Sequence, residues 1–172
     1  NDNHGFVLRS TCIGLEGTLG IITAATRKLY PLPVGSCTAL LGLASIDDAI
    51  AMLARARHGF GASLTGFELM AGDCLADVVR CFPQQRLPFN GESAALPWYA
   101  LLELSDSESD AHAQERFEPV LGEAIVTGFV KDAVPAGSIA QSKLFVLLPE
   151  SIPLSQMESG QGTPPPVSIP LF

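Results

Sequence analysis

The residues of this chain that could carry out chemistry are few and widely spaced. Glu68 and Glu103 lie inside the apolar stretches FELM and LLELS, where a buried carboxylate could act as a general acid or base. A strand carboxylate that faces solvent or pairs with a nearby Lys or Arg is the more common case and is favoured here. Lys131 and Asp132 are adjacent in an expected strand, so they point to opposite faces and cannot form one catalytic pair. No catalytic residue is assigned from these patterns.

Metal and thiol chemistry are not indicated either. The histidines form no HxH, HxxxH or HExxH pattern, so surface or helix-capping positions are expected for His4, His58 and His112. The four cysteines show no CxxC spacing, which argues against a zinc site or a redox motif: Cys12, Cys37, Cys74 and Cys81. Because Cys74 and Cys81 are seven residues apart on an expected helix, both are expected to pack on one buried face. No metal-binding residue is assigned.

A glycine-containing segment near the N-terminus is a separate candidate. Residues 16–22 have the sequence EGTLGII, in which two glycines three residues apart precede two isoleucines. Glycine lets the backbone approach a ligand closely because it has no Cβ, and Ile21 and Ile22 could exclude water from such a contact. Taken alone the spacing is weak evidence, since a tight turn also explains these glycines.

The surrounding chain predicts strands that alternate with helices. Residues 18–30 predict one or two buried strands, which the prolines of PLPVGS end. Further strands are expected over 37–45, 64–70, 98–105 and 125–134, and helices over 46–59, 73–82, 107–125 and 138–148. The alternation is compatible with a parallel doubly wound sheet, but the strands are short and no glycine fingerprint follows the first of them. An α+β sandwich is therefore the preferred fold class.

Capping patterns define two of the expected helix starts. Ser45 with Asp48, and Ser138 with Gln141, have the spacing of a capping box. Gly59 is expected to end the first of these helices. Apolar faces are expected at helical spacing from Ile46, Ile50 and Leu53 in the first helix and from Leu75, Val78, Val79 and Phe82 in the second.

Prolines predict where the later elements end. Pro119 should break or restart the third helix and Pro149 should end the fourth, because proline cannot donate the helical hydrogen bond. The C-terminal stretch 161–172 contains three consecutive prolines and is expected to be extended, polyproline-like chain. The acidic run that opens the third helix is most simply a solvated face.

Size and charge limit the classes of function. The chain has 172 residues, 47% of them hydrophobic, and a net charge of −8, which predicts one domain, or one domain with a piece of another. Coulomb repulsion opposes binding to nucleic acid or anionic membrane. No apolar run approaches the roughly 20 residues of a membrane span, and the first residues lack a signal-peptide pattern. A cytoplasmic location is expected.

The longer string CIGLEGTLGIITAATRKLYPLP, residues 12–33, resembles the end of the flavin-binding domain of FAD-linked oxidases of the vanillyl-alcohol-oxidase type. The resemblance is to the D-lactate, glycolate and D-2-hydroxyglutarate dehydrogenase branch. LTGFELMAGDCLADV, WYALLELS, VKDAVPAGSIAQSKLF and PESIPLSQ then follow in the order of that family's C-terminal substrate or cap domain. The resemblance implies the end of an FAD-binding domain over 1–33 and an incomplete cap domain over 34–172.

The implied fold is α+β: a ferredoxin-like antiparallel sheet with helices packed on it, preceded by a short N-terminal strand segment. The implied cofactor is FAD, lined by Glu16, Gly17, Thr18, Leu19, Gly20, Ile21 and Ile22. The implied parent reaction is oxidation of a D-2-hydroxy acid, with the catalytic base outside this chain. Because the diphosphate loop and the histidine-rich region of the family are missing, the fragment alone is expected to be inactive.

The implied partners are a small 2-hydroxy acid in the parent enzyme and either the missing flavin-domain segment or a second copy of the chain. Two positions depart from the family. Pro149 occurs where the family has the arginine that binds the substrate carboxylate, and Pro164 to Pro166 occur where it has a lysine-histidine-aspartate segment. A diverged member and a misread C-terminal sequence are two unranked explanations. A substrate that needs no such clamp is the least favoured one, because its carboxylate would be left uncompensated in a partly buried site. The alternative function is a non-catalytic α+β ligand-binding or interaction module derived from that family.

Overall fold

The computed structural model describes residues 13–14, 17–26, 28–29, 32–159 and 167–168. The chain divides into two units, Asn1–Pro31 and Leu32–Phe172. The described residues of the first unit form turns, bends and irregular chain. They are exposed, with Ile21 at 87% and Leu29 at 89%. The buried strands predicted over 18–30, and with them the expected N-terminal strand segment, are therefore wrong for the described part of that range. A β-branched run becomes a strand only beside a pairing strand, and the described chain supplies none there.

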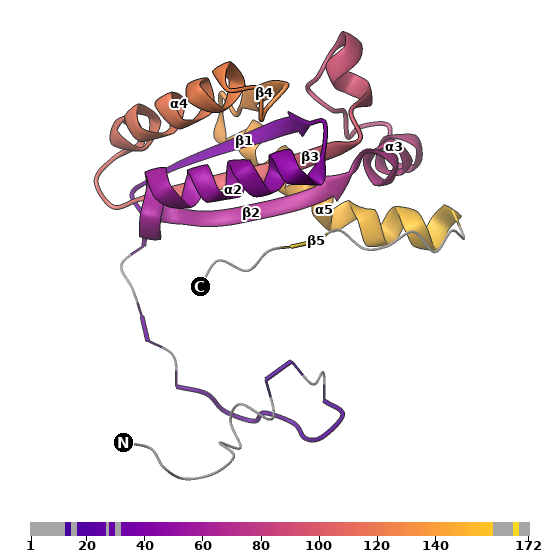
Figure 1. Cartoon of the computed structure of the whole chain (residues 1–172). Coiled ribbons are helices and arrows are strands. Elements are labelled where there is room, and N and C mark those ends of the chain that lie inside the picture. The colour runs from indigo at the N-terminus through magenta and orange to yellow at the C-terminus, as the bar shows by residue number, and fades with distance from the viewer. Residues whose placement is uncertain (1–12, 15–16, 27, 30–31, 160–166, 169–172) are drawn as a thin grey trace. The chain divides into compact units, whose positions relative to one another are not determined.

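The second unit is built on a five-stranded sheet (Figure 1). Its strands are β1 (Gly35–Leu43), β2 (Leu64–Ala71), β3 (Trp98–Asp106), β4 (Asp132–Pro135) and β5 (Val167–Ser168). They lie in the order β4-β1-β3-β2-β5, and every neighbouring pair is antiparallel. The order β4-β1-β3-β2, with a helix after β1 and after β3, is the ferredoxin-like arrangement of two interleaved βαβ units. The predicted α+β fold is confirmed.

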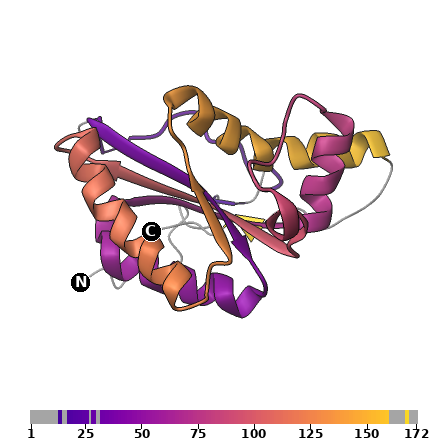
Figure 2. The ribbon, with the colours of Figure 1, turned by 90° about the horizontal axis from the view of Figure 1, so that it is seen from above.

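Four helices cover the two faces of the sheet (Figure 2). Helices α2 (Ile46–Phe60) and α4 (Asp110–Val126) pack on one face, and α3 (Gly72–Cys81) and α5 (Ile139–Ser159) pack on the other. Along β3 the side chains alternate as a pleated strand requires. Leu102 and Leu104 belong to the α2/α4 core, and Tyr99 and Leu101 belong to the α3/α5 core. Two short 3-10 turns, Gly61–Ser63 and Gly91–Ala95, lie in the connections.

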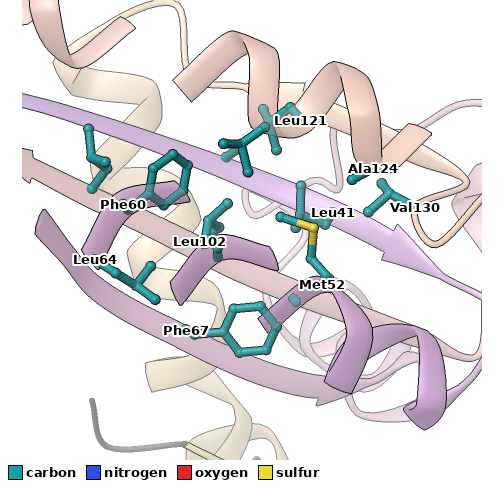
Figure 3. Close-up of a cluster of buried hydrophobic side chains, with 14 of the residues drawn as sticks. Leu41, Met52, Phe60, Leu64, Phe67, Leu102, Leu121, Ala124 and Val130 are labelled. Atoms are coloured by element: carbon teal, nitrogen blue, oxygen red, sulfur yellow. The ribbon is translucent and has the colours of Figure 1, made fainter. Parts of the chain in front are cut away.

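Figure 3 shows the core under α2 and α4, where Leu41 and Leu102 from the sheet meet Met52 and Phe60 from α2. The buried face of α2 consists of Ala49, Met52, Ala56 and Phe60. The predicted apolar face was wrong for Ile46, which is 47% exposed, and for Ile50, which is 59% exposed, whereas Leu53 packs against this core. Small alanines let this helix approach the sheet closely, so its larger isoleucines lie on the outer side.

The predicted helix starts are confirmed, whereas one end is wrong. Ser45 caps α2 by accepting a hydrogen bond from the Asp48 amide at 3.1 Å, and Ser138 accepts one from the Gln141 amide at 3.2 Å. Helix α2 ends at Phe60 and is capped by Gly61 rather than by Gly59, because Gly61 has a φ of 56°, which favours glycine. In α3, Leu75 and Val78 are buried as predicted, whereas Val79 and Phe82 are only partly buried.

The prolines do not end the helices as predicted. Helix α4 continues through Pro119, which is exposed, so that the carbonyl four residues earlier can bond to water. Helix α5 continues through Pro149 and Pro153. Its inner face is held by burial of Phe145, Leu148 and Ile152 in the α3/α5 core. Tertiary packing thus outweighs the loss of one hydrogen bond at each proline.

The C-terminal half differs from the prediction in two further places. Helix α4 extends to Val126 and a turn follows at Gly128, which has a φ of 83°, so β4 is shorter than the predicted strand over 125–134. Most of 161–172 lies outside the described residues, and the described pair Val167–Ser168 forms β5. No helix within the described ranges is long and apolar enough to cross a membrane.

Candidate functional site

The segment 16–22 presents backbone groups and apolar side chains. Glu16 lies outside the described residues. Leu19, Ile21 and Ile22 are exposed, and a Cβ added at Gly17 or Gly20 would meet no atom of the described chain within 4 Å. Gly17 has a φ of 83°, which favours glycine. These groups fit one apolar wall of a flavin site, but the described segment carries no cation to balance a diphosphate.

The second candidate region is the polar part of the sheet face that also carries α3 and α5. Register pairs Glu68 with Leu101 and Gly66 with Glu103, so the two glutamates are diagonal neighbours on one face. Gly66 makes room for Glu103, since a Cβ at residue 66 would come within 2.5 Å of Glu103 Oε2. We call Glu68 and Glu103 the sheet carboxylates.

The environment of the sheet carboxylates raises their pKa values. Burial is the main cause for Glu68, and the negative charge of Glu150 on α5 adds to it. Burial is also the main cause for Glu103, to which the charge of Glu68 adds. Neither carboxylate forms an ion pair with a described residue, so the pairing with Lys or Arg favoured from sequence is not found there. Such groups hold a proton more readily than an exposed carboxylate, and when ionised they repel an anion.

The two positions that the resemblance implies to be departures, Pro149 and Pro164 to Pro166, adjoin in the sequence residues that neighbour Glu68. Pro149 is a buried residue of α5, and the residue after it, Glu150, is the one whose charge raises the pKa of Glu68. Pro164 to Pro166 lie outside the described residues, but Val167 and Ser168 follow them directly and pair with Leu69 and Glu68. The fold therefore brings two segments from distant parts of the sequence to Glu68.

A second charged cluster joins the end of β3 to α4. The carboxylate of Asp106 lies 2.9 Å from Nδ1 of His112 and 3.2 Å from Nη1 of Arg116. Arg116 also donates hydrogen bonds to the Ser63 hydroxyl and the Phe60 carbonyl. These contacts fasten α4 to the ends of β3 and α2, which is a structural role.

The hydrogen bond between Asp106 and His112 shifts the pKa values of both groups. It is the largest cause of a pKa of about 2 for Asp106, and it is the main cause that raises the pKa of His112. Within the described ranges, no three side chains of His, Cys, Asp or Glu gather as a metal site. Sequence patterns missed this cluster because its residues are six and ten positions apart across a strand, a turn and a helix.

A hollow of about 560 Å³ lies between α3 and the segment that connects it to β3. Four separate stretches of sequence contribute its walls: 72–79, 86–89, 94–96 and residue 99. None of these residues belongs to the polar part of the sheet face around Glu68. No local motif identifies such a hollow, because it exists only after the connecting segment has folded back over α3.

The chain is similar in sequence to several dehydrogenases. It is 30% identical over 151 residues to "D-2-hydroxyglutarate dehydrogenase, mitochondrial" of Rattus norvegicus, which covers 88% of this chain and 27% of that protein. It is 29% identical over 170 residues to the protein of that name from Bos taurus, an alignment that covers 99% of this chain and 30% of that protein. It is 32% identical over 142 residues to "D-2-hydroxyglutarate dehydrogenase" of Stutzerimonas stutzeri (strain A1501), covering 80% and 28%.

These matches agree with the branch that the sequence motifs resemble. The chain spans less than a third of the length of the curated relatives it matches. No protein-family model matches the chain. The similarity to the Bos taurus protein extends over both units of this chain.

Proposed function

We propose that this chain is the cap-domain portion of an FAD-dependent dehydrogenase that acts on a D-2-hydroxy acid. In this proposal residues 1–33 are the end of the flavin-binding domain and residues 34–172 are an incomplete substrate domain. The observation that carries the proposal is the meeting of two distant segments at Glu68. Val167 and Ser168 reach it through β5, and Glu150, beside Pro149, reaches it from α5. These are the segments in which the resembled family has its substrate-binding cations.

The residues of this chain would have a positioning role. Residues 16–22 would form one wall of the flavin site, where the backbone at Gly17 and Gly20 approaches the cofactor and Ile21 and Ile22 exclude water. The flavin would supply the hydride-accepting chemistry. The polar part of the sheet face would border the substrate. The diphosphate contacts and the catalytic base would come from protein outside this chain, so the chain alone is proposed to be inactive.

A visible-absorption experiment tests the flavin part of the proposal. The purified chain is mixed with excess FAD and desalted, and its spectrum and intact mass are recorded. A band retained at about 450 nm indicates a working part of a flavin site. A colourless protein of the mass of these 172 residues counts against retention of the cofactor by this chain alone, and means that the flavin chemistry must be sought in protein outside it. The Gly20→Val variant is the control, because a side chain at residue 20 would obstruct the proposed backbone approach.

The second candidate is a non-catalytic ligand-binding or interaction module. It is favoured by the charges around Glu68, where burial and the glutamates raise the carboxyl pKa values. Such a face repels a hydroxy-acid carboxylate unless a cation from elsewhere offsets it. Binding of D-2-hydroxyglutarate, measured by calorimetry, distinguishes the two candidates in a chain joined to its flavin domain. Saturable binding supports the dehydrogenase, and absence of binding supports the module.

The exposed apolar side chains of the first unit lead to a further part of the proposal. Leu19, Ile21, Ile22 and Leu29 are exposed, and exposed apolar side chains mark an interaction site where they form one patch. We expect a flavin-domain segment or a second copy of the chain to cover it. A monodisperse, non-associating monomer at high concentration in size-exclusion chromatography would contradict this.

A cytoplasmic location also remains a prediction.

A further inference from the structure

We propose that the hollow between α3 and the connecting segment binds a small apolar α-amino acid, at a site independent of the dehydrogenase function proposed above. Its volume of about 560 Å³ falls in the range of roughly 300–1,000 Å³ that is usual for small-molecule sites. Such sites combine mostly apolar walls with a few polar groups that fix orientation. The lining of this hollow has that composition.

The apolar part of the hollow has a rigid aromatic floor. Phe89 and Tyr99 are buried, and their ring centroids lie 5.3 Å apart. The Tyr99 hydroxyl accepts a hydrogen bond from the Leu96 amide at 3.0 Å and donates one to the Ser93 carbonyl at 2.9 Å. These two bonds fasten the connecting segment over the floor. Since the hydroxyl is already used, Tyr99 contributes its ring rather than a polar contact.

Small side chains keep the hollow open. Ala76 on α3 and Ala94 and Ala95 on the connecting segment line it, and all three are exposed. Gly72 allows close contact between the start of α3 and the connecting segment, because its amide donates to the Pro97 carbonyl at 2.8 Å. Larger residues at the alanine positions would fill the space that an apolar side chain could occupy.

Two charged residues, Asp73 and Arg86, are among those that line the hollow, and both are exposed at its open side. No ion pair within the described part of the chain uses either of them. A guanidinium binds a carboxylate through paired hydrogen bonds, and a carboxylate binds an ammonium group. A free amino acid with an apolar side chain carries all three matching features: a carboxylate for Arg86, an ammonium for Asp73 and an apolar group for the aromatic floor.

The proposal is tested by three related probes measured by isothermal titration calorimetry with the 172-residue chain. Phenylalanine carries both charged groups, 3-phenylpropionate lacks the ammonium, and 2-phenylethylamine lacks the carboxylate. Phenylalanine is expected to bind about tenfold more tightly than either of the others, since each loses one charge-assisted contact. Equal affinities for the three probes, or no binding of phenylalanine at millimolar concentration, would overturn the proposal.

Paired variants assign each contact to its residue. In Arg86→Gln the preference for phenylalanine over 2-phenylethylamine should disappear, while the preference over 3-phenylpropionate remains. In Asp73→Asn the reverse should hold. Ala76→Leu should weaken all three probes by filling the hollow, whereas Ala140→Leu, at an exposed position of α5, should change none. Circular dichroism spectra that match the parent chain show that each variant is folded. If Arg86→Gln and Asp73→Asn leave the preferences unchanged, the site is not the one described.

Discussion

The Nδ1 atom of His112 lies 2.9 Å from Oδ2 of Asp106, and this contact joins the first turn of α4 to the end of β3. The Asp106 side chain is almost fully buried, whereas that of His112 is partly exposed. Arg116 shares the same carboxylate oxygen at 3.2 Å. A buried carboxylate is tolerated here because a histidine, an arginine and the Glu108 amide all bond to it. We call Asp106, His112 and Arg116 the α4 clamp.

The stability of the chain should depend on pH through the α4 clamp. The pKa of His112 is raised above 6.5 in the folded state, mainly by its hydrogen bond to Asp106, so this stabilisation is complete below pH 6.5 and is lost as the pH rises through the folded value. The pKa of Asp106 is lowered from 3.8 to about 2, so its stabilisation is lost as the pH falls below 3.8. The contribution of the α4 clamp to the free energy of unfolding should therefore be greatest between pH 3.8 and pH 6.5.

Other groups near His112 change the size of its pKa shift but leave the shift upward. The carboxylate of Glu108, 3.9 Å from Nδ1, also raises the pKa of His112, and the positive charge of Arg116 and partial burial lower it. Urea-denaturation midpoints of the parent chain and His112→Gln, measured from pH 5 to pH 8, test the prediction. The difference between them should shrink as the pH rises. His58→Gln, at the exposed end of α2, is the control, and a difference independent of pH would contradict the clamp.

The orientation of α2 can be tested by two alanine substitutions. Met52→Ala should lower the free energy of unfolding by about 2–5 kcal/mol, because Met52 is fully buried and the change leaves a cavity. Ile50→Ala should change it by less than about 0.5 kcal/mol, because Ile50 is exposed. The free energies of unfolding of both variants are measured by chemical denaturation. A larger loss for Ile50→Ala would mean that the face expected from the isoleucines is the buried one.

Two glycine-to-alanine substitutions should have opposite signs. A Cβ at Gly72 would collide with the backbone carbonyl of Leu96, so Gly72→Ala should destabilise the fold by roughly 1–3 kcal/mol. At Gly122, inside α4, a Cβ would meet nothing within 4 Å, so Gly122→Ala should stabilise it by about 0.5–1 kcal/mol. Thermal unfolding reports both effects. If Gly72→Ala loses no stability relative to the parent chain, the close contact at Gly72 is not formed.

The charge of Glu150, the residue after Pro149, raises the pKa of Glu68, and a charge placed at residue 149 tests whether that position also faces Glu68. An arginine in Pro149→Arg should lower the pKa of Glu68, because an opposite charge nearby favours the ionised form. Leu147→Arg, at an exposed position of the same helix, should have a smaller effect. The pKa of Glu68 is followed by NMR of its side-chain carboxyl carbon. An equal shift in both variants would show that residue 149 does not face Glu68.

Much of the fold could be predicted because its local signals agree with its tertiary contacts. The Ser45 cap, the strand over 98–105 and the order of elements were all correct, since capping groups and short apolar runs act locally. The errors occur where contacts between residues far apart in the sequence determine the local structure. Pro149 is accommodated inside α5 by packing against α3 and the sheet, and Ile50 lies outside because Met52 and the alanines fit the core.

The candidate site was less predictable. Glu68 was singled out from its sequence context, but its partners come from α5 and from β5, about 80 and 100 residues later in the chain. Asp106 and His112 were missed because the acidic run near them is typical of a solvated face. The hollow beside α3 was missed because its walls meet only in the folded chain. The assignment of residues 16–22 to a flavin site stays a prediction.

The most direct test of the central proposal is a titration of the ¹⁵N-labelled chain with FAD, followed by the backbone amide resonances. We expect the amide resonances of Gly17, Thr18, Gly20, Ile21 and Ile22 to shift and those of the α4 clamp to stay unchanged. The Gly20→Val variant should lose the shifts. Unchanged resonances at residues 17–22 with millimolar FAD, or shifts confined to other residues, would contradict it.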